Sequence, residues 1–225
     1  MKHFKDDDRM ADKEMIKPTK QDTEVFFDIY KNRPFKEQNH GGMLLPHLFA
    51  TWFWMKQLNP KKIIESGTFQ GLGTWVIEQA CPDAKIYSID IYPNQRKYIS
   101  PTVEYFDKDI TEYEWDNTAV IHFDDHMNAL DRVLWAKEKG FKYLFFEDNY
   151  PEGQGDCVSL KQNKEFREKH GTYEEFPPVF ARNTNRWGLP WNFYETPDPI
   201  FDTPDETNAY YQEAKSYTWI CLYTL

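Results

Sequence analysis

The chain has 225 residues, a formal net charge of −10 and an aromatic content of 17%. This length suits one α/β domain with a sizeable hydrophobic core. The acidic balance argues against a phosphate-backbone partner, which needs a basic face, so we expect no nucleic-acid ligand. The longest apolar stretch, residues 43–55, contains Pro46 and His47 and is too short to span a bilayer, so we expect no insertion into a membrane.

The first residues are charged, and no signal-peptide core follows them. We interpret residues 1–20 as a mobile arm and residues 21–225 as a single domain. Cys81, Cys157 and Cys221 are scattered and form no C-x-x-C pair, so neither a disulfide framework nor a structural zinc site is indicated. This cysteine usage is compatible with a reducing compartment, and we expect a cytoplasmic protein.

Two helices are predicted before the first strand. Residues 23–30 predict a short helix, and the aromatic-rich residues 44–58 predict a helix that is apolar on most sides and therefore well buried. Residues 33–42 form a polar, irregular loop between them. Such a loop either folds over a ligand, in which case Gly42 belongs to the ligand site, or simply links the two helices.

A glycine-rich turn follows the first predicted strand. Ile63 and Ile64 form a short β-branched run, typical of a strand in a covered parallel sheet. Residues 65–73, with the sequence E-S-G-T-F-Q-G-L-G, then lead into a helix with apolar residues on one face: Leu72, Trp75, Val76 and Ala80. Gly67 and Gly71 allow backbone angles and close approaches that side chains would block.

The next predicted strand, residues 86–89, ends in Asp90, which can accept hydrogen bonds from two ribose hydroxyls. Two kinds of ligand compete for this layout. A dinucleotide site needs G-x-G-x-x-G, whereas here Glu65 stands at the head of the turn, where it would repel a pyrophosphate but could hold an amino group. S-adenosylmethionine carries such a group, so the sequence favours it over NAD, with these candidate cofactor residues: Glu65, Gly67, Thr68, Gly71 and Asp90.

Further strands are predicted at residues 103–106, 119–123 and 143–146. A helix with one apolar face and Gly140 past its end lies between the last two, and its face is predicted from Met127, Leu130, Val133 and Leu134. Strands that alternate with helices indicate an α/β fold with a doubly wound, mostly parallel, Rossmann-like sheet. Asp109 and Ile110, after the third strand, are expected to flank the adenine of the cofactor.

Acidic residues stand where each predicted strand ends, and such sheets bind ligands at the carboxyl ends of their strands. The two richest ends are Asp124-Asp125-His126 and Glu147-Asp148-Asn149. An acid from one end and an acid pair from the next would supply part of the oxygen shell that Mg²⁺ prefers. Alternatively, Asp125 caps the following helix, and Glu147 or Asp148 pairs with an arginine. His126 could be a neighbour of the metal, a general base or a satisfied polar residue.

Residues 150–200 are rich in proline and glycine, and we interpret them as a loop-rich insertion over the carboxyl edge of the sheet. The insertion either caps the fold or holds substrate through Trp187, Trp191, Tyr194, and Arg182 or Arg186. A capping threonine and a proline predict a helix over residues 203–215, and residues 217–225 predict a terminal strand.

At these residues the chain resembles class I S-adenosylmethionine-dependent methyltransferases. More narrowly, it resembles sugar O-methyltransferases related to the cephalosporin-hydroxylase-like group, which includes macrolide-sugar and rhamnosyl O-methyltransferases. The resemblance covers roughly residues 41–155 and is carried by residues 64–71, Asp90 and residues 145–150. It implies that Mg²⁺ or Mn²⁺ is bound by Asp125, Glu147 and Asp148 and that His126 is the base. One departure is that His126 directly follows Asp125, whereas in those relatives the histidine follows the metal acid by three residues.

The resemblance implies transfer of a methyl group to a hydroxyl of a sugar, with Asp124 as support for the metal site or as a substitute ligand. The acceptor would be a glycan, a glycoside or a nucleotide sugar, and a deoxysugar such as rhamnose is favoured. Catechol-type methyltransferases also resemble the site, since Asp148-Asn149 matches their metal pair. A non-catalytic binding or scaffold domain is the alternative outside enzymes. The sequence leaves the oligomeric state open.

Overall fold

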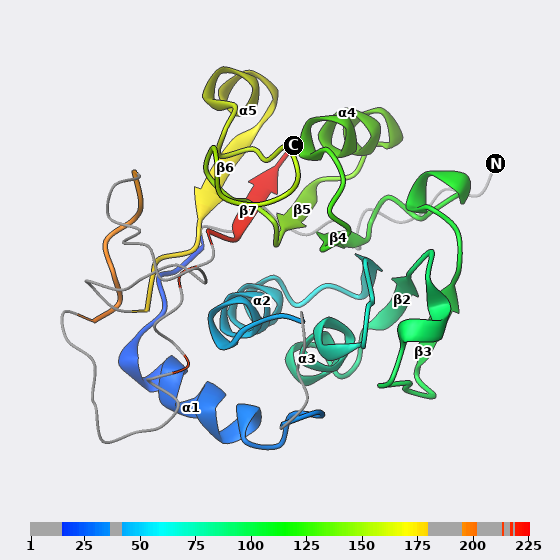
Figure 1. The fold of residues 1–225 in the computed structure, drawn as a ribbon, viewed down its shortest axis with the longest axis vertical. Helices are drawn as coiled ribbons and strands as arrows, with labels where there is room; N and C mark the ends of the chain where they lie inside the picture. Colours follow the sequence, from blue (N-terminus) through cyan, green and yellow to red (C-terminus); the bar gives the residue numbers. More distant parts are fainter. Residues whose placement is uncertain (1–14, 37–41, 180–194, 202–212, 214–216, 218) are drawn as a thin grey trace.

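The computed structural model describes residues 15–36, 42–179, 195–201, 213, 217 and 219–225. These residues build one seven-stranded sheet with the order β3-β2-β1-β4-β5-β7-β6 (Figure 1). The parallel strands are β1 (Lys62–Ser66), β2 (Lys85–Ile89), β3 (Val103–Phe106), β4 (Val120–Phe123) and β5 (Tyr143–Phe146). The strand β7 (Cys221–Thr224) runs antiparallel to both β5 and β6 (Thr172–Glu175). The prediction of a doubly wound, mostly parallel sheet is confirmed.

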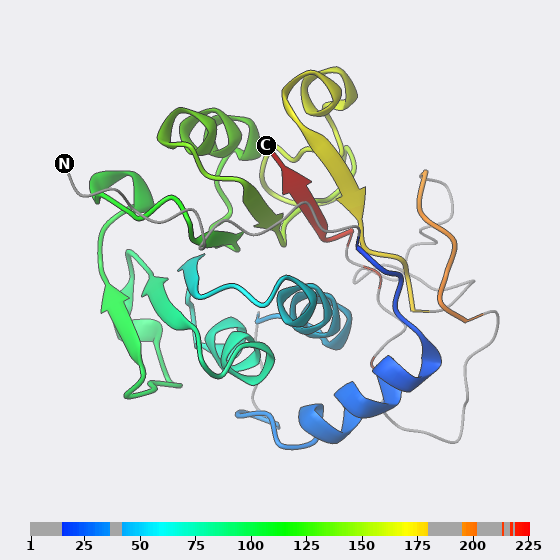
Figure 2. The ribbon, with the colours of Figure 1, turned by 180° about the vertical axis from the view of Figure 1, so that it is seen from behind.

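Helices cover both faces of the sheet (Figures 1 and 2). On one side lie α1 (Lys20–Tyr30), α2 (Leu45–Leu58) and α3 (Leu72–Ala80), and on the other lie α4 (Ala129–Lys139) and α5 (Lys164–His170). Neighbouring residues of a strand point to opposite faces, so Ile63 packs with the α1–α3 side and Ile64 with the α4 side. Because both faces are covered, the central strands β4 and β5 are buried at every residue, and β1 is buried at all but its first.

The helix α2 is buried on almost every side, as its sequence predicts. Its large aromatic residues, including Trp52 and Trp54, are at most 3% exposed. Two of its polar residues, His47 and Thr51, are one turn apart and also buried. They face the sheet through contacts with β4 and β5 that are described below. Among the described residues, no helix is long and apolar enough to cross a membrane.

The apolar face predicted for the helix after β4 is wrong at two of its four positions. Met127 lies before the helix and is 52% exposed, and Leu134 is 46% exposed. The helix begins later because the Asn128 side chain accepts a hydrogen bond from the Leu130 backbone at 3.0 Å and caps it. Gly140 closes the helix in the left-handed conformation, as expected.

The region predicted as a loop-rich insertion contains regular structure, since residues 164–175 form α5 and the edge strand β6. The predicted substrate-side residues and nearly all of the helix predicted over residues 203–215 lie outside the described residues. At the other end of the chain, residues 1–14 of the predicted arm are also outside them. Ile16, by contrast, exchanges two backbone hydrogen bonds with the Gln57 side chain on α2, so the last part of that arm is docked.

Candidate cofactor and metal site

A cavity of about 350 Å³ lies at the carboxyl ends of the parallel strands. It is lined by most of the predicted cofactor and catalytic residues: Gly42, Gly67, Thr68, Asp90, Asp109, Asp124, Asp125 and His126. The other predicted site residues are not part of its lining: Glu65, Gly71, Ile110, Glu147 and Asp148. The loop residue Gly42 therefore does reach the cavity, together with its neighbour Met43.

The turn after β1 fits tightly between the ends of β2 and β4. The Gly67 backbone N–H donates to the Ile89 carbonyl at 2.9 Å, and the Asp124 N–H donates to the Ser66 carbonyl at 2.8 Å. Gly67 has a φ of +99°, and a Cβ there would lie 1.9 Å from the Asp124 carbonyl oxygen. Only glycine can occupy this position. The close contact between the ends of β1 and β4 therefore explains why a glycine occupies this position.

Glu65 is fully buried behind the cavity wall. The Ser88 hydroxyl donates to its Oε2 at 2.6 Å, and Thr74 donates to the same atom. Oε1 accepts no hydrogen bond among the described residues and faces Gly73, which lines the cavity. Burial raises the pKa of Glu65 to about 7, although the two hydroxyls oppose this shift. A cationic group in the cavity would favour the charged carboxylate.

Asp90 is held by the turns on both sides of it. The Phe69 backbone N–H donates to Oδ2 at 2.5 Å, and the Tyr92 N–H donates to Oδ1 at 2.7 Å. The glycine turn after β1 therefore positions the acid after β2. Each oxygen keeps acceptor capacity for a ligand, because a carboxylate offers about four acceptor sites.

Asp109 caps the short 3₁₀ helix Ile110–Glu112 and binds a buried arginine that the sequence analysis missed. Arg132 of α4 donates to both Asp109 oxygens, at 2.9 and 2.6 Å, and lies 2.8 Å from Asp125 Oδ2. The arginine is 6% exposed and lines the cavity. A signal for it existed, because position 132 shares the buried helix face of Ala129, Val133 and Ala136.

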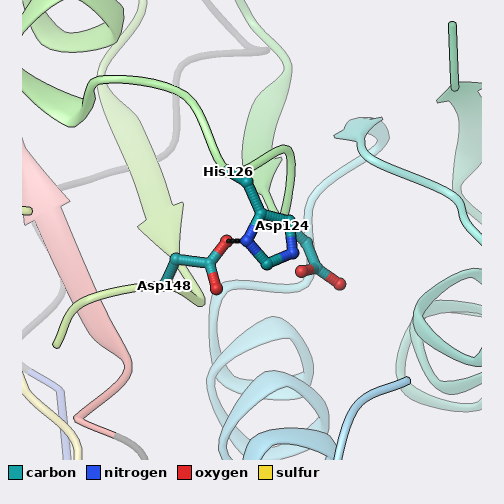
Figure 3. A group of neighbouring side chains, drawn as sticks. All are labelled: Asp124, His126 and Asp148. Atoms are coloured by element: carbon teal, nitrogen blue, oxygen red, sulfur yellow. Dashed lines mark ion pairs between the residues drawn. The ribbon is translucent and has the colours of Figure 1, made fainter. Parts of the chain in front are cut away.

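Asp125 does not join the carboxylates that could hold a metal ion. Besides its ion pair with Arg132, its Oδ2 accepts a hydrogen bond from the Ser66 hydroxyl at 2.7 Å. The group that the structure brings together is instead Asp124, His126 and Asp148, whose ligand atoms lie within 4.8 Å of one another (Figure 3). This group shares only Asp148 with the predicted metal set of Asp125, Glu147 and Asp148.

Asp148 is buried at 8% exposure, and within the described residues neither of its carboxylate oxygens accepts a hydrogen bond. His126 Nδ1 approaches Oδ2 at 3.6 Å, which is an ion pair but not a hydrogen bond. Burial, together with the charge of Glu147, raises the pKa of Asp148 well above its usual range. Burial, together with the charges of Glu147 and Asp148, raises the pKa of Asp124. The charges of His126 and His47 oppose the shift at Asp148 but do not cancel it, so a bound cation would add positive charge where both carboxylates need it.

Glu147 has a different partner. His47 of α2 forms an ion pair with it, and both side chains are at most 5% exposed. One turn further on, the Thr51 hydroxyl contacts His122 Nε2 at 3.2 Å, and burial lowers the pKa of His122 to about 3. The residues of α2 thus bind the polar groups beneath the site. His47 was not among the predicted site residues, since a lone histidine in an apolar helix gives no signal of its partner.

His126 is exposed and has a φ of +54°, a conformation rare outside glycine. Its Nδ1 lies 3.0 Å from Oδ1 of Asp156, which comes from the loop after β5. Burial lowers the pKa of His126, but the charges of Asp148 and Asp156 outweigh this, so the pKa is raised overall. Strained residues of this kind are held in place by their surroundings and gather at functional sites.

Asn149, the residue that would complete a catechol-type metal pair, is fully buried in internal contacts. Its Nδ2 donates to the Tyr173 hydroxyl and to the Trp219 carbonyl, both at 2.7 Å, and its Oδ1 accepts from the Lys161 backbone at 2.9 Å. These contacts tie β5 to β6 and β7. The asparagine therefore has a structural role in this fold.

Neither a protein-family model nor a curated protein sequence matches this chain. Among solved structures, it is similar to the O-methyltransferase TomG from Streptomyces achromogenes, involved in tomaymycin synthesis and in complex with S-adenosylmethionine. That likeness has a TM-score of 0.50 and 10% identity, over 94% of this chain and 92% of TomG. The tRNA (m1A58) methyltransferase TrmI from Aquifex aeolicus gives 0.50 and 11%, over 84% and 71%.

At these identities the likeness shows the fold alone, which is the class I methyltransferase fold. Of the two structures named above, one is an O-methyltransferase and the other a tRNA methyltransferase. The fold therefore does not identify the methyl acceptor, and the reaction has to be inferred from the residues of the site.

Proposed function

We propose that this protein is an S-adenosylmethionine-dependent O-methyltransferase. The observation that carries the proposal is a single cavity lined by the glycine turn after β1, by Asp90 after β2, and by Asp124 and His126 after β4. The first two features suit an amino acid joined to a ribose. The third suits an acceptor hydroxyl that must lose a proton.

The cofactor would lie with its methionine end near Glu65 and Gly67 and its ribose on Asp90. Two features support this orientation: Oε1 of Glu65 faces Gly73, which lines the cavity, and Asp90 is fixed by two backbone N–H groups. The base would then extend toward Asp109 and Ile110. The acceptor side is the end of β4, which lies next to β1 in the sheet.

A divalent cation is the second part of the proposal. Asp124 and Asp148 would hold it, because their carboxylates gather at the site and Asp148 accepts no hydrogen bond among the described residues. Oxygen ligands of this kind suit Mg²⁺ or Mn²⁺ better than zinc or copper. When bound, the cation would lower the pKa of the acceptor hydroxyl and orient its oxygen.

His126 would be the general base. Asp156 lies against Nδ1, so this carboxylate can accept the Nδ1 proton and leave Nε2 to take the proton of the hydroxyl. The hydroxyl oxygen attacks the methyl carbon, the carbon–sulfur bond breaks, and the sulfonium leaves as a neutral thioether. No acid is needed for the leaving group. Asp124 is the alternative base if His126 is dispensable.

The acceptor is the finer part of the proposal, and we propose a sugar hydroxyl, with deoxysugars favoured. The support is the resemblance at residues 64–71 and 145–150, together with the internal hydrogen bonds of Asn149, which weaken the match to catechol enzymes. A catechol or phenol acceptor is the alternative among enzymes. A non-catalytic scaffold is the alternative outside them.

The binding step is tested by calorimetry with S-adenosylhomocysteine on the wild type and on Asp90→Ala. We expect the variant to bind at least about tenfold more weakly, because hydrogen bonds to a charged acceptor contribute about 1.5–3 kcal/mol each. Unchanged affinity in a folded variant would contradict the placement of the ribose.

The reaction is tested with a labelled methyl donor and a panel of deoxysugar glycosides beside catechols. Turnover of glycosides that stops on chelation and returns with Mg²⁺ or Mn²⁺ would support the whole proposal. Turnover of catechols alone would overturn the acceptor class, and full activity after exhaustive chelation would remove the cation. Binding of S-adenosylhomocysteine without turnover of any acceptor would favour the scaffold.

A further inference from the structure

The carboxylate of Asp125, next to His126 in the chain, is anchored on two sides. Its Oδ2 accepts a hydrogen bond from the Ser66 hydroxyl at 2.7 Å and forms an ion pair with Arg132 Nη2 at 2.8 Å. Arg132 is buried and is itself fixed, because it donates a forked pair of hydrogen bonds to Asp109. The position of this carboxylate is therefore set by the end of β1 and by the first turn of α4.

The other oxygen of the same carboxylate closes a turn around His126. Asp125 Oδ1 accepts a hydrogen bond from the Met127 backbone N–H at 3.3 Å. A bond from an aspartate to the backbone two residues later stabilises a turn in the way that a backbone hydrogen bond does. His126 is the residue enclosed by this turn, and its φ is +54°. The anchored carboxylate thus holds the backbone on both sides of a strained histidine.

The left-handed conformation of His126 has a cost that its surroundings must offset. Residues with a side chain disfavour it by a factor of about ten relative to the right-handed conformation. In the held conformation, Nδ1 lies 3.0 Å from Asp156 Oδ1 and 3.6 Å from Asp148 Oδ2 (Figure 3). If the turn opened, the backbone of His126 would relax and its ring would point in another direction.

We propose that Asp125 is a positioning residue for His126. It holds the histidine in the conformation that directs Nδ1 to Asp156 and leaves Nε2 for the proton of the acceptor hydroxyl. This inference rests on the function proposed above, which makes His126 the general base. An ionised carboxylate only accepts hydrogen bonds, so Nδ1 carries the proton of the neutral ring as long as Asp156 faces it. The place of the ring proton therefore reports whether the ring is held.

Nitrogen-15 NMR of the histidine rings tests this inference in the protein without cofactor or cation. At a pH where the His126 ring is neutral, the spectra show whether Nδ1 or Nε2 carries the proton, and His126→Gln assigns the signals. We expect the proton on Nδ1 in the wild type, and a fall of about tenfold in the ratio of this form to the other in Asp125→Ala. The signals of the buried His47 and His122 should stay in place, which controls for the fold.

Asp125→Asn separates the turn from the charge. Asparagine keeps a side-chain oxygen for the Met127 N–H, so we expect this variant to retain the Nδ1 proton that Asp125→Ala loses. In the methyl-transfer assay, Asp125→Ala should likewise lower kcat by about tenfold, and Asp125→Asn should recover most of the loss. A purely structural role of the buried charge would affect both variants alike.

A wild-type ring with its proton on Nε2 would overturn the inference, and so would an unchanged Nδ1 proton in Asp125→Ala. Loss of the Nδ1 proton in a folded Asp125→Asn would also overturn it, and this result decides even if Asp125→Ala does not fold. Failure of the proposed function is a distinct result. S-adenosylhomocysteine would then not bind, whereas the place of the ring proton is measured without it.

Discussion

Two adjacent aspartates after β4 take different partners. Asp125 is engaged by Ser66 and Arg132, whereas Asp124 lies with His126 and Asp148 in the group that could hold a cation. Asp124 and Asp148 both have a raised pKa because they are buried near other acids. Their arrangement is costly without a positive charge, so a bound cation should stabilise the folded protein.

We predict that Mg²⁺ or Mn²⁺ raises the melting temperature of the wild type and of Asp125→Asn, but not of Asp124→Asn or Asp148→Asn. At 100 times the dissociation constant the gain is about 2.7 kcal/mol, or about 5–10 °C for a domain of this size. Thermal unfolding with and without the cation measures it. Asp125→Asn is the matched control, since it changes the neighbouring residue in the same way. Loss of the shift in Asp125→Asn alone would restore the ligand set implied by the sequence.

The choice between Asp124 and Asp125 illustrates what a sequence leaves undetermined. That acids gather after β4 and β5 follows from the strand pattern and the rule for parallel sheets. Which acid faces the neighbouring strand depends on the backbone of the turn, including the left-handed His126, and on Arg132 in the first turn of α4. The helix pattern indicates that Arg132 is buried, but nothing in the local sequence indicates which acids it binds.

At the scale of elements, α2 binds the sheet through a polar contact as well as through its aromatic residues. His47 of α2 and Glu147 after β5 form a buried ion pair beside Asp148. Removing one partner of such a pair leaves an unbalanced buried charge, whereas replacing both by apolar residues often costs little. The pair therefore makes the docking of α2 dependent on the identity of both residues.

We predict that His47→Leu lowers the free energy of unfolding by about 3–5 kcal/mol and that the double variant His47→Leu with Glu147→Leu recovers much of this loss. Urea unfolding of the wild type, both single variants and the double variant forms the required cycle. Measurements are made without metal ions, so that a change in the metal site does not enter. Additive losses in the double variant would show that the two residues act independently.

The strands differ in how well their own sequences predict them. The strands β1, β4 and β5 are buried along almost their whole length, so their runs of apolar residues predict them well. The edge strand β6 has the sequence T-Y-E-E, which does not indicate a strand. Its Glu175 is buried because Lys161, Tyr173 and Tyr217 bind it, and Lys161 and Tyr217 come from other segments. Such a strand becomes recognisable only when its distant partners are in place.

At the scale of the whole molecule, several buried groups compete to set how stability depends on pH. Glu65, Asp124 and Asp148 have a raised pKa in the folded state, so the unfolded chain releases their protons at lower pH. Their contribution to stability is present below about pH 4 and is lost as the pH rises through their folded pKa values. His122 opposes them, since its pKa is lowered to about 3 and its contribution is lost as the pH falls below about 6.5.

Between pH 5 and 7 the stability lost by the three acids exceeds the stability gained by the one histidine. We therefore predict that the ligand-free protein becomes less stable as the pH rises across about pH 5–7. Glu65→Gln isolates one of these groups, because glutamine keeps the shape of the side chain and does not titrate. The shift of the Glu65 pKa from 4.5 to about 7 corresponds to about 3 kcal/mol. Relative to Glu65→Gln, the wild type should therefore lose about this much stability between pH 4.5 and 8.

Chemical unfolding of both proteins at a series of pH values measures the difference. Glu138→Gln, on the exposed side of α4, is the matched control. A wild type that gains stability over this range relative to Glu65→Gln would contradict the prediction. It would show that the Glu65 carboxylate is charged and stabilised in the ligand-free protein, without an amino group from the cofactor.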